Sequence, residues 1–168
     1  FIQLLKDGGR AGIVLPDGSL TGEGVKQRVR QKLLEDCNVH TIVRLPQSVF
    51  APYATVNTNL IFFEKGKKTK EIWYYEHTLP EGAKAYNKTK PIRIEEFDTI
   101  KKWWKKREES DVCWKVSIAT IIERNYDLDI KNPNNKIEEV KLDKNEILTN
   151  LKNSFQKSMS IVDELKME

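Results

Sequence analysis

A loop with two aromatic side chains separates two predicted strands. Residues 44–64 read RLPQSVFAPYATVNTNLIFFE, and Phe50, Pro52 and Tyr53 stand in the irregular stretch between two apolar runs. Loops usually carry Gly, Asn, Asp and Ser, because these residues solve backbone problems. Two aromatics in such a loop therefore need a packing or a binding reason. Phe50 and Tyr53 are the first candidates for a functional role.

The elements before this loop place it at one edge of a sheet. Continuous apolar runs predict strands at 11–15, covered on both faces, and at 39–45, and a helix is expected between them at 22–36. The apolar face of that helix would contain Val25, Val29 and Leu33. Such a βαβ unit has parallel strands and a right-handed crossover. The loops Pro16–Ser19 and Pro46–Thr55 then share the edge where open α/β sheets bind ligands.

Further elements follow the loop. The runs at 59–63 and 72–75 predict strands, and their short connection favours an antiparallel hairpin. A helix is expected at 95–107, with Phe97, Ile100 and Trp104 on its apolar stripe and Trp103 pointing off that stripe. A short element at 114–123 and a loop at 125–135 come next. The fold class is α/β, with a helical C-terminal appendage.

Composition restricts both the class of protein and the kind of site. With 39% hydrophobic and 32% charged residues, the chain belongs to the globular class. No apolar run approaches the ~20 residues of a membrane span, and no secretory leader is recognisable, so we expect no membrane contact and a cytoplasmic location. Cys37 and His40 have ligand-like spacing, but zinc needs three or four ligands, so no metal is expected. The net charge of +4 permits a polyanionic partner without requiring one.

Two charged or amphipathic stretches are candidates for contacts with macromolecules. A basic run interleaved with aromatics is either a DNA-backbone surface or a solvated helix face that packs on its apolar side; it contains Lys101, Lys102, Lys105, Lys106 and Arg107. A heptad-like seam near the end either folds back onto the domain or lies along a partner helix; it contains Leu148, Leu151, Phe155, Val162 and Leu165.

Three stretches together resemble a known family. GGRAGIVLPDGSL at 8–20, IVRLPQSVFAPYATVNTNLIFFEK at 42–65 and YDLDIKNPN at 126–134 are similar to the modification (methyltransferase) subunit of type I restriction-modification systems. The resemblance covers residues 1 to about 135. It implies the C-terminal half of a class I, Rossmann-like, S-adenosylmethionine-dependent methyltransferase sheet. The strands at 11–15, 39–45 and 59–63 would be the fifth, sixth and seventh, with the seventh antiparallel and inserted between the other two.

The resemblance also implies an activity and its partners. Family members methylate the exocyclic amine of adenine in DNA and work with a specificity subunit and a restriction subunit. Their Gly-rich cofactor turn and their catalytic Asn-Pro-Pro-aromatic motif are both missing from these 168 residues. S-adenosylmethionine is therefore expected in the full-length enzyme, and this fragment alone should neither bind it nor methylate. No catalytic residue is assigned in this chain.

Target-base residues carry over from the same resemblance. Related adenine methyltransferases place an aromatic ahead of the seventh strand to stack on the flipped adenine, and Val49-Phe50-Ala51-Pro52 matches that context with one inserted residue. Phe50 is the stacking candidate, and Tyr53 is the alternative. The competing interpretation is that either ring packs at the end of the sheet as a core residue. Pro52 shapes the same loop. Asp17 touches the substrate, supports the loop or, as Asp-Gly pairs more often do, simply forms a turn. Thr58 and Asn59 are interpreted as structural.

The expected organisation has two parts and leaves one alternative function open. Residues 1–94 would form the C-terminal half of the methyltransferase α/β domain, and residues 95–168 a helical extension. The alternative is a non-catalytic module with a basic helical tail that docks on protein or DNA.

Overall fold

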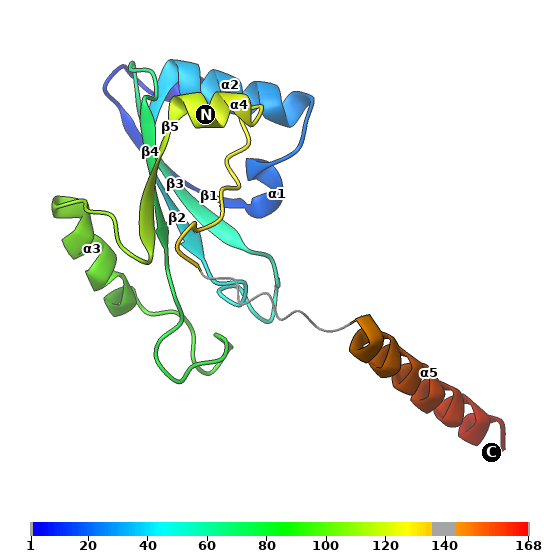
Figure 1. Ribbon diagram of the computed structural model, residues 1–168. Coiled ribbons are helices and arrows are strands. Elements are labelled where there is room, and N and C mark those ends of the chain that lie inside the picture. Colours follow the sequence, from blue (N-terminus) through cyan, green and yellow to red (C-terminus); the bar gives the residue numbers. More distant parts are fainter. Residues whose placement is uncertain (1, 136–143, 168) are drawn as a thin grey trace. The chain divides into compact units, whose positions relative to one another are not determined.

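The chain forms two compact units. The structure, a computed structural model, describes residues 2–135 and 144–167 (Figure 1). Its contacts define one unit at Phe1–Asn135 and another at Lys136–Glu168, and the second contains helix α5 (Lys144–Met167). Residues 95–135 belong to the first unit. The division expected at residues 94 and 95 is therefore not the division between these two units.

A five-stranded sheet organises the first unit. The strand order is β1-β3-β2-β4-β5. The strands are β1 (Arg10–Pro16), β2 (Cys37–Leu45), β3 (Thr58–Lys65), β4 (Glu71–Glu76) and β5 (Cys113–Ser117). Strand β3 is antiparallel to both β1 and β2, whereas β2 and β4 are parallel and β5 is antiparallel to β4. The insertion of the 59–63 strand between its two predecessors is confirmed.

The predicted hairpin between β3 and β4 is wrong, because β2 lies between them. The connection at 66–70 passes around the amino end of β2 instead. Five residues reach roughly 16 Å, which is enough to cross two strand spacings of about 4.8 Å each. Thr69 fixes the crossing, because its Oγ1 donates to Cys37 O at 2.7 Å and accepts from Val39 N at 2.8 Å.

Helices α2 (Val25–Asp36) and α4 (Ile118–Glu123) contribute to the larger core cluster on one face of the sheet (Figure 1). The predicted apolar face of α2 is wrong at two of its three positions, since Val25 is 68% and Val29 59% exposed. The buried residues of α2 are Arg30 and Leu34. The helix is thus rotated from the orientation that its valines indicate.

Arg30 explains that rotation. Its guanidinium makes three short hydrogen bonds to backbone carbonyl oxygens, to Tyr126 O at 2.6 Å from Nε, to Thr21 O at 2.9 Å from Nη1 and to Gly22 O at 2.5 Å from Nη2. A fourth and longer bond joins Nη1 to Ser19 O at 3.4 Å. Gly22 has a φ of +90° and Tyr126 a φ of +60°, so both carbonyls belong to irregular backbone. Buried carbonyl groups need donors, and Arg30 supplies them from α2.

The opposite face is covered by a short helical layer. The helix expected at 95–107 is a 3₁₀ turn, η2 (Ile94–Phe97), followed by α3 (Asp98–Lys105). Trp104 packs edge-on against Phe62 of β3 with ring centroids 5.0 Å apart. Trp103, expected to point away, lies against Tyr75 of β4 at 5.1 Å. Both indoles therefore pack against the sheet, because two sides of α3 contact it.

Both histidines are held partly or wholly out of water. His77 is 7% exposed and stacks on Phe97 with centroids 5.1 Å apart. His40 is half-buried beside Trp104, and Arg107 donates to its carbonyl oxygen at 3.2 Å. Burial lowers the pKa of each imidazole, and the Arg107 charge lowers the pKa of His40 further. The folded chain thus favours the neutral form of both rings.

Replacing Arg30 by Met should destabilise the protein. The substitution leaves buried carbonyl oxygens without donors, a loss of about 1–3 kcal/mol in the free energy of unfolding. Arg28→Met, at an exposed position of the same helix, is the matched control and should change it by less than about 0.5 kcal/mol. Urea unfolding followed by tryptophan fluorescence measures both. Equal effects of the two substitutions would contradict the assigned role.

Stability should fall as the pH drops below about 6.5, the ordinary pKa of His. The unfolded chain takes up protons there, while the folded chain, with both pKa values lowered, resists protonation until a lower pH. His40→Phe keeps a ring against Trp104 and removes one titrating group, so its loss of stability between pH 7.5 and 5.5 should be smaller. Unfolding curves across that range test this; an unchanged pH slope in the variant would refute it.

Candidate functional site

Polar side chains from three distant segments meet at the carboxyl ends of β1 and β2. Asp17 begins the short helix α1 (Asp17–Leu20) directly after β1. Arg44 lies near the end of β2 and is paired in register with Asn59 of β3. Asp129 comes from the irregular segment after α4. These four residues, hereafter the polar cluster, draw on the three sequence stretches that resemble one family.

The members of the polar cluster bind one another. Arg44 Nη1 lies 2.7 Å from Asp129 Oδ1, and Arg44 Nη2 lies 3.5 Å from Asp17 Oδ2. Asn59 Nδ2 donates to Asp17 Oδ1 at 2.6 Å. Arg44 thus lies between two carboxylates, and Asp17 connects it to Asn59 at the start of β3.

Two members of the polar cluster are buried, so their contacts fix the geometry of the site. Arg44 is 9% exposed and Asn59 0%. Burial opposes the ionisation of Asp129, but hydrogen bonds from Arg44 and Lys131 outweigh it, and the pKa of that carboxyl is lowered. Asn59 Oδ1 is buried without a partner among the described residues. Because Nδ2 already donates to Asp17, turning the amide over would place two acceptors against each other.

The aromatic loop at 46–57 leaves the sheet next to this cluster. Phe50 is 44% exposed and Tyr53 88% exposed, so neither ring is buried as a core plug would be. The loop is compact, because Phe50 O accepts from Tyr53 N at 2.9 Å and Gln47 Nε2 donates to Thr55 O at 2.7 Å. Its exposed rings are available to stack on a planar ligand.

Asp17 connects the loop to the polar cluster. Its backbone N donates to Asn57 O at 3.0 Å, at the end of the loop. Its carboxylate accepts a hydrogen bond from Asn59 and pairs with Arg44, so Asp17 does more than form a turn. Thr58 and Asn59 are both buried, in agreement with a structural role. The structure therefore brings Asp17 and the stem of the aromatic loop together.

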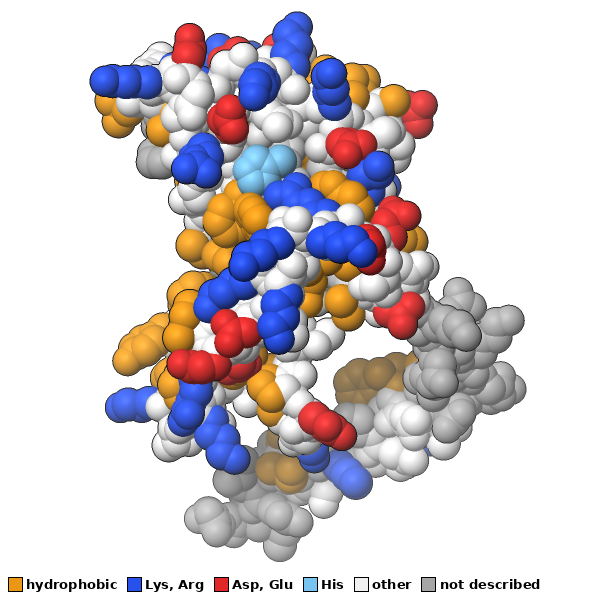
Figure 2. Space-filling model, turned by 90° about the vertical axis from the view of Figure 1, so that its left-hand side faces the viewer, with side chains coloured by type: hydrophobic (Ala, Val, Ile, Leu, Met, Phe, Trp, Pro, Cys, Tyr) orange, Lys and Arg blue, Asp and Glu red, His pale blue; other side chains and the backbone are white. Residues whose placement is uncertain are grey.

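The basic candidates lie elsewhere, on the face that carries α3, where lysine and arginine side chains surround apolar ones (Figure 2). Lys101 pairs with Asp98 at 2.8 Å and Lys106 with Glu108 at 2.7 Å. The Arg107 guanidinium lies 4.8 Å from the centre of the Trp104 ring and is occupied there. Lys102 and Lys105 are exposed, with no ion pair among the described residues.

Helix α5 presents apolar side chains to solvent. Leu148 and Leu151 are each 52% exposed, Phe155 63% and Val162 50%. The side chain of Leu165, the last residue of the predicted seam, lies outside the described residues. Over the part of the chain that the structure describes, no helix is both long and apolar enough to cross a membrane.

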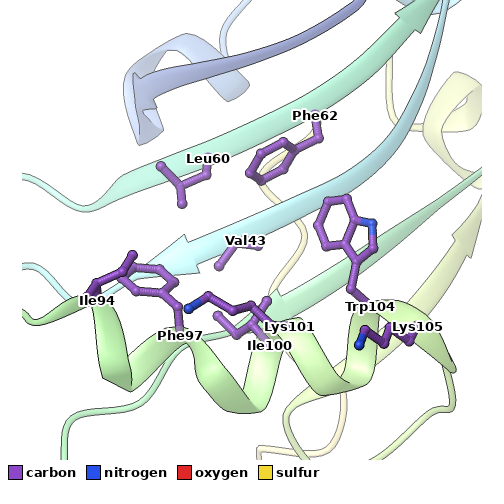
Figure 3. A pocket seen from close by; sticks show the side chains of 9 residues that line it. All are labelled: Val43, Leu60, Phe62, Ile94, Phe97, Ile100, Lys101, Trp104 and Lys105. Atoms are coloured by element: carbon purple, nitrogen blue, oxygen red, sulfur yellow. The ribbon is translucent and has the colours of Figure 1, made fainter.

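An apolar groove of about 540 Å³ lies on the face of the sheet, between β2, β3 and α3 (Figure 3). Val43, Leu60 and Phe62 form its floor, and Phe97 and Ile100 approach from the helical layer. Its lining includes the stems of Lys101 and Lys105 but none of the polar cluster. This groove is separate from the site at the strand ends.

The residues present do not fit S-adenosylmethionine. A cofactor of that kind needs free donors and acceptors beside a Gly-rich turn. Within residues 2–135, the polar groups at the strand ends bind one another, and the one orphaned atom there, Asn59 Oδ1, is closed off from solvent. The carbonyls of Thr21 and Gly22 are taken up by Arg30. Among the described residues there is also no group of His, Cys, Asp and Glu that could hold a metal ion.

Sequence reasoning missed Arg44 and Asp129. A usable signal existed for Arg44, because an arginine inside the apolar strand run Ile42-Val43-Arg44-Leu45 must find partners when the strand is buried. No comparable signal identifies Asp129, since Asp127 and Asp129 alternate in a loop rich in turn residues. Only the fold shows that Asp127 accepts from Thr21 Oγ1 at 2.8 Å while Asp129 faces Arg44.

Comparison with known proteins identifies the family of the chain. The family model for N-6 DNA Methylase matches residues 1–141. Over 140 residues the chain is 54% identical to the EcoEI type I restriction enzyme methylase subunit of Escherichia coli, covering 79% of this chain and 29% of that protein. It is 34% identical over 113 residues to the StySJI methylase subunit of Salmonella typhimurium, covering 60% of this chain and 21% of the relative. The chain thus spans less than a third of the length of these relatives.

Solved structures show the same fold. The modification subunit of a putative type I restriction enzyme from Vibrio vulnificus superposes with a TM-score of 0.71 at 46% identity, over 76% of this chain and 28% of that one. A chain from a structure of type I R-M system assembly gives a TM-score of 0.73 at 39% identity, over 96% and 36% of the two chains. The predicted class I methyltransferase sheet is confirmed. The chain therefore belongs to the N-6 DNA methylase family, and its relatives there are methylase subunits of type I restriction enzymes.

Proposed function

We propose that the chain is part of a type I DNA methylase that modifies the exocyclic amine of adenine, and that its loop at 46–57 forms one wall of the target-base pocket. The supporting observation is the exposed aromatic loop at the carboxyl end of β2, whose stem is held by the buried polar cluster. A rigid stem and exposed rings are what a base-binding wall requires.

The physical problem that this wall solves is base extrusion. An enzyme that modifies a base inside duplex DNA must flip it out of the stack and hold it there. Stacking on an aromatic side chain is worth about 1–3 kcal/mol per base, a useful part of the unstacking cost. Phe50 is the proposed stacking ring, because it follows Val49, which fixes where the loop begins to turn. Val49 packs against the smaller core cluster, which consists of Val43, Leu45, Tyr75, Ile100 and Cys113.

Tyr53, Pro52 and Asp17 support this wall in different ways. Tyr53 is almost fully exposed and lies at the far side of the same turn, so it is the second stacking candidate. Pro52 stands between the two rings and limits the loop's conformations. Asp17 acts through Asn59 and the loop's end rather than by an open carboxylate, since both of its oxygens are engaged.

The full-length methylase would bind S-adenosylmethionine through residues other than these. We propose DNA-backbone contact for Lys101, Lys102, Lys105, Lys106 and Arg107, with exposed Lys102 and Lys105 as the strongest members. The exposed apolar residues of α5 would lie along a helix of the specificity subunit, within a complex that also contains the restriction subunit. The alternative, a non-catalytic docking module, is not favoured by the family match.

Replacing Phe50 by Ala should lower kcat/KM for DNA by roughly 5- to 150-fold in the full-length methylase assembled with its specificity subunit, because one base-stacking contact is lost. Phe50→Tyr retains a ring and should stay close to the parent. Methylation assays on a target duplex provide the measurement. A larger loss in Tyr53→Ala than in Phe50→Ala would transfer the stacking role to Tyr53, and no loss in either variant would refute the wall.

The isolated chain should not bind S-adenosylmethionine in the micromolar range, because its polar groups at the strand ends are already paired. Isothermal calorimetry measures this, with circular dichroism to establish that the chain is folded. The full-length methylase is the positive control. Micromolar binding by the 168 residues alone would contradict the proposal that the cofactor site lies outside them.

A further inference from the structure

The connection between β4 and η2 contains one buried residue in an otherwise exposed stretch. Along residues 78–94 the backbone forms neither helix nor strand up to Arg93, and Tyr86 alone is buried, with 5% of its surface exposed. The segment descends from the end of the sheet that also carries the aromatic loop (Figure 1). A lone buried tyrosine in such a segment acts as an anchor for it.

Two side chains outside the segment hold the Tyr86 hydroxyl. It donates to Glu96 Oε2 at 2.5 Å, and His77 Nε2 lies 3.2 Å from the same hydroxyl. His77 directly follows β4 and Glu96 belongs to η2, so the anchor bridges the two ends of the segment. Glu96 Oε1 also accepts from Arg93 N at 2.8 Å, which fixes the carboxylate itself.

The protonation states determine which group donates in the hydrogen bond between Tyr86 and Glu96. Burial and the hydrogen bond to Glu96 raise the pKa of Tyr86. Burial opposes the ionisation of Glu96, but the bonds from Tyr86 and Arg93 prevail and lower its pKa. At neutral pH the Tyr86 hydroxyl is therefore protonated and donates a hydrogen bond to the Glu96 carboxylate. Hydrogen bonds with a charged acceptor are the stronger class.

The same residue reaches the aromatic loop through its backbone. Tyr86 N donates to Ser48 Oγ at 2.8 Å. Ser48 lies two positions before Phe50, and its carbonyl oxygen accepts from Ala51 N at 3.0 Å inside the turn. On the other side of the loop, Asp17 N holds Asn57 O. Apart from the local bond that Thr58 Oγ1 donates to Val56 O at 3.2 Å, these are the hydrogen bonds among the described residues that tie loop 46–57 to other parts of the chain.

We propose that Tyr86 and Ser48 are positioning residues that set the place of Phe50 against the target base. The buried Tyr86 ring immobilises the 78–94 segment, and its N–H holds Ser48 at the near side of the turn while Asp17 holds the far side. With both sides fixed, the loop cannot swing as a unit. This inference rests on the proposed role of Phe50 and adds to it the residues that orient the ring.

A purely structural role is the competing explanation. Tyr86 is 5% exposed, so its removal could lower stability without affecting the base site. Ser48 separates the two explanations, because it is only half-buried and its hydroxyl can be removed without opening a core cavity. Ser48→Thr keeps the accepting oxygen and is the conservative rescue, and Lys84→Ala is a control at an exposed position of the 78–94 segment.

The experiment uses the full-length methylase with its specificity subunit. Ser48→Ala should lower kcat by about 3- to 10-fold, the effect of one ordinary hydrogen bond, with KM for S-adenosylmethionine unchanged. Ser48→Thr and Lys84→Ala should match the parent. Tyr86→Phe, which loses only the hydroxyl contacts, should lower kcat in the same direction, and the double variant Ser48→Ala/Tyr86→Phe should lose less than the product of the two effects, because both act on one brace.

A spectroscopic signature accompanies the kinetics. With 2-aminopurine at the target position, the fluorescence decay contains a quenched component when the extruded base is stacked on an aromatic ring. Phe50→Ala should abolish that component, and Ser48→Ala should reduce its share while Ser48→Thr restores it. In a Phe50→Ala background, Ser48→Ala should have no further effect on kcat.

The outcomes separate the two proposals. If Phe50→Ala leaves kcat and the quenched component unchanged, Phe50 is not the stacking ring and the positioning role is overturned; if Tyr53→Ala is also without effect, the base wall fails as well. If Phe50→Ala has its effect while Ser48→Ala behaves like the parent, the wall stands and the positioning role is overturned. A loss on Ser48→Ala that persists undiminished in the Phe50→Ala background also overturns it, since Ser48 would then act elsewhere.

Discussion

The placement of Arg44 is the constraint on which the site depends. A guanidinium that is 9% exposed at the end of a central strand must be paired, and Asp17 and Asp129 pair it from segments far apart in the chain. Removing one partner from such a buried charge is costly, on the order of several kcal/mol. The pairing therefore locks the segment after β1, the start of β3 and the segment after α4 into one arrangement.

The aromatic loop depends on these contacts for its position, because its internal hydrogen bonds fix its shape but not its place relative to the sheet. Its rings face solvent, and only Val49 enters a core cluster. A loop of this kind keeps a defined shape when its two ends are fixed by groups that cannot themselves move. Asn59 and Asp17 fix the end, and Tyr86 holds the beginning through Ser48, so the loop's position is set by buried polar contacts rather than by its own packing.

The strands at 11–15, 39–45 and 59–63 and their order could be predicted, because apolar runs locate these strands and the family resemblance gives their order. The errors share another cause. Val25 and Val29 suggested one face of α2, but Arg30 turned the helix inward to satisfy three carbonyl oxygens. A short connection suggested a hairpin, but Thr69 capped the start of β2 and allowed β4 to pass to its other side. Polar side chains that bind distant groups leave little trace in hydropathy, and the partner of Arg44 at Asp129 escaped prediction for the same reason.

The fold leaves an apolar edge and an apolar groove open, whereas its polar cluster is closed. Among the described residues β1 pairs only with β3, Val14 on it is 53% exposed, and the groove over Leu60 and Phe62 is apolar. An unpaired apolar edge and an uncovered apolar face are features that globular proteins avoid leaving to water. The polar cluster, by contrast, satisfies its own charges. The contacts that hold the proposed base wall thus lie within the described residues, whereas the free edge of β1 and the apolar groove are surfaces on which further protein can pack.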